Sequence, residues 1–164
     1  MATNGPLIGL TVDGKGPGED IALPAATHML DLHGWLRSLT GIDHLEVVMN
    51  GKVVKSVVPT GDKASADFAE QIAIQHSGWL LLRAWNDRAT PDVFDLYPYA
   101  TTNPVFVNIG DDPMRSKADA QFFLKWIDKV KVSAAASPDY DTRAERYAVL
   151  RHIEDARRVF EERL

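Results

Sequence analysis

The feature that most constrains the fold is an abrupt change of pattern near residue 112. Before it, the chain consists of short apolar runs separated by turn residues, which is typical of β-strands. After it, Ser116 opens an aromatic-rich segment whose apolar residues recur at helical spacing. We therefore predict a β domain over residues 1–112. A helical extension over residues 113–164 should pack on that domain or on a neighbouring one.

Two segments of the first part carry clear strand patterns. Residues 45–49 and 53–58 flank Asn50-Gly51, the pair that best tolerates the two positive φ angles of a type I′ hairpin turn. Residues 29–36 alternate, with Leu30, Leu32 and Leu36 on one face and Asp31, His33 and Arg37 on the other. Both patterns predict strands of an antiparallel sheet.

Further along, residues 79–85 are almost all apolar, which predicts a central strand buried on both faces. Residues 86–102 are expected to form a long loop. About seven short strands separated by turns, without βαβ alternation, favour a mainly β fold. We predict an antiparallel immunoglobulin-like β-sandwich of about seven strands, followed by two C-terminal α-helices.

The helical part has recognisable starts. Ser116 precedes Asp119, and Thr142 precedes Glu145, at the spacing of a capping box. Residues 132–138 are small and are expected to link the two helices. One helical stripe carries Phe123, Trp126, Ile127 and Val130.

Composition argues against several functional classes. The net charge is −5 and no basic block occurs, so nucleic-acid binding is not expected. No run of eighteen apolar residues exists that could span a membrane. The absence of cysteine excludes disulfides, thiolate zinc sites and cysteine nucleophiles. The first residues lack a signal-peptide pattern, and the compartment stays undetermined.

Catalytic and metal motifs are also missing, so we predict no catalytic, cofactor-binding or metal-binding residues. The glycine-rich residues 14–18 do not lead into a helix, as a phosphate loop would. The histidines lack metal-ligand spacing, and no Gly-x-Ser-x-Gly elbow occurs. Were the chain an independent enzyme, Asp31, His33 and Arg37 would be the first place to look for a site.

Aromatic residues between positions 79 and 99 suggest ligand binding, because exposed rings on a sheet can stack on sugars. The candidates are Trp79, Trp85, Tyr97 and Tyr99. The competing interpretation is that both tryptophans belong to the core and the tyrosines close a loop.

Several segments together resemble the C-terminal region of CehA/McbA-type metallohydrolases, which are relatives of the PHP phosphoesterase superfamily. The resemblance extends to about residue 130. It is carried by residues 4–7, 12–18, 45–54, 77–84, 102–107, 115–116, 119–120 and 123–128.

In that family a catalytic domain, with ligands in motifs such as His-x-His, precedes this region. No such motif occurs here, so the resemblance transfers no catalytic residue. It implies a non-catalytic accessory C-terminal domain that packs against the metal-dependent hydrolase domain of the same parent. Parents of this type are often exported, to the periplasm or outside the cell. The alternative is a carbohydrate- or ligand-binding β-sandwich module that uses the loop aromatics.

Overall fold

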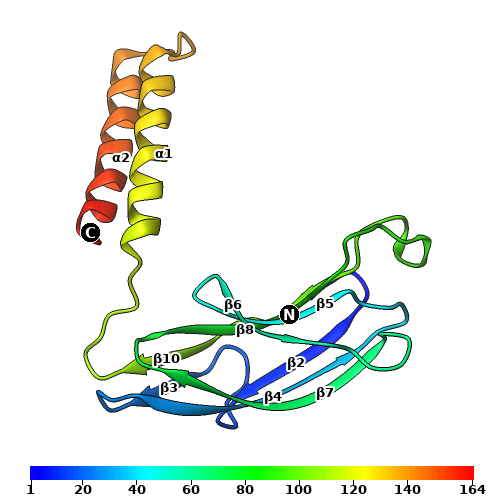
Figure 1. Ribbon diagram of the computed structural model, residues 1–164. Coiled ribbons are helices and arrows are strands. Elements are labelled where there is room, and N and C mark those ends of the chain that lie inside the picture. Colours follow the sequence, from blue (N-terminus) through cyan, green and yellow to red (C-terminus); the bar gives the residue numbers. More distant parts are fainter. The chain divides into compact units, whose positions relative to one another are not determined.

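The computed structural model describes residues 1–164 and divides the chain into two compact units (Figure 1). The β unit spans Met1–Met114 and the helical unit spans Arg115–Leu164. The division falls two residues beyond the predicted boundary after residue 112. The mainly β fold with two C-terminal helices is confirmed.

The β unit contains ten strands in two sheets, more than the seven or so predicted. The strands are β1 Ala2–Thr3, β2 Leu7–Val12, β3 Asp20–Leu23, β4 His28–Arg37, β5 His44–Met49, β6 Lys52–Val57, β7 Ser65–Ile74, β8 Gly78–Trp85, β9 Tyr99–Thr101 and β10 Val105–Ile109. Strands β2, β4 and β7 form a three-stranded sheet, and the other seven form the second sheet. The estimate was too low because strands as short as β1, β3 and β9 have too few residues to show alternation.

Strand β8 is the centre of the larger sheet. It pairs with β5 along one edge and with both β9 and β10 along the other, in every case antiparallel. One pairing departs from the predicted antiparallel arrangement, since β10 runs parallel to β3. That pair joins residues near the start of the unit to its last strand.

Both sheets contribute side chains to a single apolar core. Leu30, Leu32 and Leu36 of β4 are fully buried, as the alternation predicted, and so are Leu80 and Leu82 of β8. The prediction that β8 is buried on both faces is wrong. Its residues alternate between buried and half-buried, because only one face of the larger sheet meets the core.

The Asn50-Gly51 turn is confirmed, with φ angles of 49° and 79° at its two residues. Within the predicted loop 86–102, the structure instead forms a 3₁₀ turn at Pro91–Val93 and strand β9. The loop prediction therefore holds only for the remaining residues.

The helical unit is a hairpin of α1 (Lys117–Ala136) and α2 (Arg143–Glu161). Both predicted caps are present: the hydroxyls of Ser116 and Thr142 accept hydrogen bonds from the backbone N–H of Asp119 and Glu145. Residues 132–136 belong to α1, contrary to the predicted linker, because alanine is the strongest helix former. No helix has the length and hydropathy to cross a membrane.

Candidate functional site

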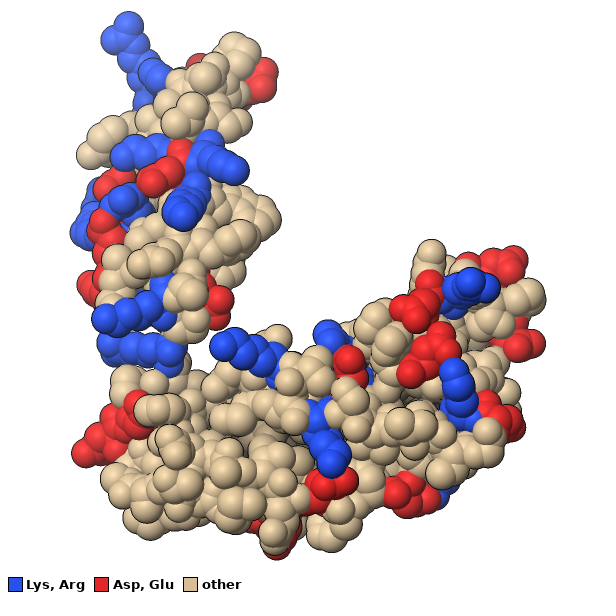
Figure 2. All heavy atoms as spheres, viewed as in Figure 1, with Lys and Arg blue, Asp and Glu red and all other residues tan.

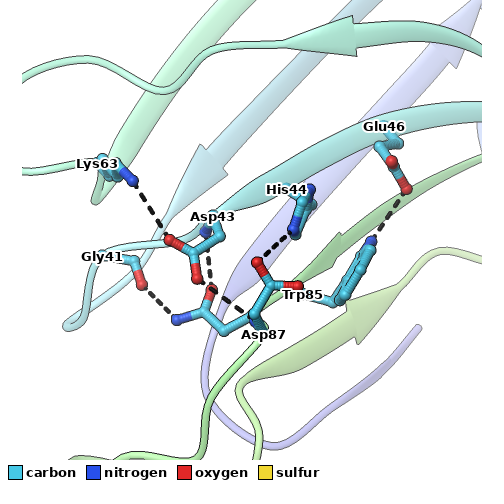
Figure 3. A network of polar contacts seen from close by, with 8 residues as sticks. Gly41, Asp43, His44, Glu46, Lys63, Trp85 and Asp87 are labelled. Atoms are coloured by element: carbon cyan, nitrogen blue, oxygen red, sulfur yellow. Dashed lines mark hydrogen bonds and ion pairs between the residues drawn. The ribbon is translucent and has the colours of Figure 1, made fainter.

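The outer face of the larger sheet carries a connected group of polar and aromatic side chains, which we call the β5–β8 cluster: His44, Glu46, Arg83 and Trp85. Figure 3 shows His44, Glu46 and Trp85 of this cluster. The register of β5 and β8 places His44 opposite Trp85 and Glu46 opposite Arg83. Side chains directly opposite each other on neighbouring strands interact most strongly. The cluster is therefore a direct product of the pairing between β5 and β8.

Glu46 is the hub of this cluster. Its Oε2 accepts hydrogen bonds from Arg83 Nη2 at 2.7 Å, Arg83 Nε at 2.9 Å and Trp85 Nε1 at 3.0 Å. Burial raises the pKa of Glu46, but the hydrogen bonds from Trp85 and Arg83 and the charge of Arg83 outweigh burial and lower the pKa. The carboxylate is thus held ionised, with Oε2 engaged by Arg83 and Trp85.

The ring of Trp85 is similarly occupied. His44 stacks on it with ring centroids 3.9 Å apart and an interplanar angle of 16°. The His44 Nε2 atom lies 3.0 Å from Asp87 Oδ2, which holds the imidazole in place (Figure 3). Because one face and the N–H of Trp85 are already engaged, this indole is a poor platform for a ligand.

A second set of contacts ties the ends of β5 and β8 together. The amide of Asn86 accepts from the backbone N–H of Asp43 at 2.8 Å and donates to the carbonyl of Gly41 at 2.7 Å. Lys63 lies 3.3 Å from Asp43 (Figure 3). Burial raises the pKa of Asp43, but the hydrogen bonds from Lys63 and from the backbone of Asp87 lower it overall. These contacts tie the start of β5 to the residues that follow β8 and keep Asp43 ionised.

The four aromatic candidates do not form one site. Tyr99 lies opposite Trp85 on β9 and is 42% exposed, and Tyr97 is 60% exposed in the preceding loop. Trp79 lies six residues from Trp85 on β8, opposite Phe106, and is half-buried. The structure places Trp85 and Tyr99 opposite each other and separates Trp79 from them, a grouping that the sequence did not predict. The interpretation that both tryptophans are core residues is wrong, since both are on the outer face.

The face that sequence reasoning proposed for an independent enzyme lies on the smaller sheet. Asp31 accepts a hydrogen bond from Gln71 at 2.6 Å, and Arg37 donates to both oxygens of Asp67. No group of three metal-ligating side chains converges anywhere in the chain. Sequence reasoning overlooked Trp35 on this face, although the alternation of residues 29–36 places Trp35 on the same side as Asp31.

The helical unit presents a different kind of surface, an aromatic stripe on α1 formed by Phe122, Phe123, Trp126 and Val130. These side chains are between 42% and 57% exposed. Edge-to-face contacts join Phe122 to Phe123 and to Trp126, with centroids 5.6 and 5.8 Å apart, and Phe123 stacks on Phe160 of α2. Figure 2 shows charged side chains of both signs on the helical unit, with uncharged surface between them.

No family model matches the chain, and no curated protein matches it. Among solved structures, it has a distant likeness to the CARDB domain of PF1109 from Pyrococcus furiosus. The solution NMR structure of that domain aligns with a TM-score of 0.35 and 18% identity, over 63% of this chain and 95% of that one. A crystal structure of the same domain, in complex with di-metal ions, aligns with a TM-score of 0.34 and 17% identity, over 68% and 100% of the two chains. These scores are too low to support an inference about function.

Proposed function

We propose that this chain is a non-catalytic accessory C-terminal domain of a metal-dependent hydrolase related to the CehA/McbA type. In this proposal the β unit is an immunoglobulin-like β-sandwich, and the helical unit packs against the catalytic domain of the parent. The two sheets with one shared core support the first part. The aromatic stripe of α1 is the observation that carries the second part.

A hairpin of two helices cannot bury an aromatic stripe of this kind by itself. Each helix covers only the side of its neighbour that faces it, where Leu124, Ile127, Leu150 and Ile153 are half-buried. The only buried side chain of α1 is Ala120, and α2 has none. These aromatic side chains can therefore be buried from solvent only by a partner outside the hairpin.

The stripe is large enough to form the apolar centre of a contact. Three aromatic side chains of about 200 Å² each, roughly half exposed, offer about 300 Å² of apolar surface. At about 25 cal/mol per Å², covering that surface contributes roughly 7 kcal/mol before the costs of association. A catalytic domain with a complementary apolar patch could thus use the stripe as the centre of a larger interface.

The test is a titration of the full chain with the metal-dependent hydrolase domain of the parent, followed by calorimetry. We expect binding by the natural chain and a loss of at least about ten-fold in affinity for Trp126→Ser. The matched control is Val132→Ser, which alters a 70% exposed side chain of α1 outside the stripe. Absence of binding by the natural chain, or equal affinity of the Trp126 variant, would refute the proposal.

A second candidate function, carbohydrate or ligand binding by the loop aromatics, draws support from the exposure of Tyr97 and Tyr99. The engagement of Trp85 by His44 and Glu46 weakens it. A ligand bound there should lose affinity in Tyr97→Ala and Tyr99→Ala, as measured by calorimetry against neutral oligosaccharides. Unchanged affinity in both variants would remove this candidate.

A further inference from the structure

The outer face of the β2–β4–β7 sheet contains a shallow trough of about 470 Å³. Its outward side chains come from two neighbouring rows of the sheet. Thr11, His33 and Ala69 form one row, and Trp35 and Asp67 belong to the other. The row between them points into the core, so the backbone there forms the floor of the trough. Its volume is in the range of small-molecule sites.

The indole of Trp35 lies against the sheet instead of standing away from it. A Cβ atom at Gly9, the cross-strand partner of Trp35, would lie 2.3 Å from Nε1 and 2.5 Å from Cε2 of the indole. Gly9 does not have a positive φ angle, so the backbone does not require glycine there. Glycine inside a strand weakens the strand, and it commonly marks a close approach of another group. Here the group is the Trp35 ring, which is 41% exposed although it lies against Gly9.

The polar groups beside Trp35 are suited to an uncharged ligand. Arg37 donates to both carboxylate oxygens of Asp67 at 2.9 and 2.8 Å, which balances the negative charge and leaves further acceptor sites on those oxygens. Thr11, His33 and Trp35 also line the trough, and their hydroxyl, imidazole and indole N–H groups can donate to or accept from a ligand. The trough thus combines an aromatic plane, donors and acceptors without net charge.

We infer that this trough binds a neutral saccharide. One sugar ring lies with its C–H face on the Trp35 indole, and its hydroxyls bond to Asp67, His33 and Thr11. A pyranose has an apolar face and a polar rim, which matches an aromatic plane beside donors and acceptors. A free anion would meet the carboxylate of Asp67, and a cation would meet Arg37. The trough lies on the β2–β4–β7 sheet, whereas Tyr99 belongs to β9 of the larger sheet and Tyr97 to the loop before it. The two sugar-binding proposals therefore concern different sites. The inference also does not depend on the proposed accessory role.

The experiment screens the full chain against immobilised neutral oligosaccharides and, in a separate arm, insoluble neutral polysaccharides. The two arms distinguish a soluble sugar from a polymer surface. Calorimetry then compares variants with the best soluble ligand. We expect Trp35→Ala to weaken binding about ten-fold or more and His33→Ala to weaken it several-fold. The control Tyr97→Ala, which removes a 60% exposed ring outside the trough, should bind like the natural chain.

The inference is overturned if neither arm yields binding, or if Trp35→Ala and His33→Ala both retain full affinity. It is also overturned if Tyr97→Ala loses binding while Trp35→Ala does not, since that result places the ligand at the loop. Should Trp35→Ala fail to fold, as judged by its thermal transition, Trp35→Leu and Thr11→Val take its place. The same loss of affinity is then expected from both.

Discussion

The substitution Glu46→Gln tests whether the β5–β8 cluster stabilises the β unit. Glutamine keeps the shape of the side chain but removes the charge that Arg83 and Trp85 recognise. A hydrogen bond to a buried charged group contributes about 1.5–3 kcal/mol. The Glu46 side chain is only 12% exposed but that of Arg83 is 36% exposed, so solvent screening reduces this figure. We therefore expect a loss of about 2 kcal/mol in the free energy of unfolding at pH 7.

The pH dependence of that loss makes the prediction specific. The pKa of Glu46 is lower in the folded protein than in the unfolded chain. The stability that it provides is complete above the unfolded-state pKa, about 4.3, and disappears as the pH falls through the folded-state pKa. The difference between the natural protein and Glu46→Gln should therefore shrink as the pH is lowered from 7 towards about 3.

Urea unfolding followed by tryptophan fluorescence at several pH values measures this difference directly. The control is Glu70→Gln, which removes the ion pair with Lys55, whose side chains are both 37% exposed. We expect that control to cost less than about 1 kcal/mol. A loss below about 0.5 kcal/mol for Glu46→Gln at pH 7, or a loss that is equal at pH 7 and pH 3, would refute the reasoning.

Three further predictions concern the core, the hairpin turn and the second helix. Leu82→Ala, at a fully buried position of β8, should cost about 3 kcal/mol in urea unfolding, whereas Val53→Ala at a 45% exposed position should cost under about 1 kcal/mol. Gly51→Ala should lower the free energy of unfolding by about 1 kcal/mol, because φ is 79° at Gly51. Gly16 does not have a positive φ, so Gly16→Ala should lower it less. Thr142→Ala removes the cap of α2 and should lower the free energy of unfolding by about 1 kcal/mol. The helical circular dichroism signal should fall as well. Unchanged helicity and stability would contradict this prediction.

Local signals in the sequence predicted much of the fold. The alternation of residues 29–36, the Asn50-Gly51 turn and the caps at Ser116 and Thr142 each depend on neighbours within a few positions, and each is confirmed. The parallel pairing of β3 with β10 depends on residues far apart in the chain. No local pattern reports such a contact.

The candidate site was harder to predict for a related reason. The composition of residues 79–85 is that of a buried strand, but apolar composition alone does not reveal which side chains point outward. Whether an aromatic ring is free depends on its cross-strand partner: Trp85 has His44 beside it, and Trp35 has Gly9. These partners come from register, which a single sequence does not provide.

The parallel pair β3–β10 also has a consequence for synthesis on the ribosome. Ile21 and its neighbours in β3 have no partner until Val107 and the rest of β10 have left the exit tunnel. Until then the nascent chain exposes an unpaired strand that another polypeptide could join, and the delay grows with the distance along the chain. A chaperone that binds the nascent chain until Ile109 has left the ribosome would protect this strand edge during translation.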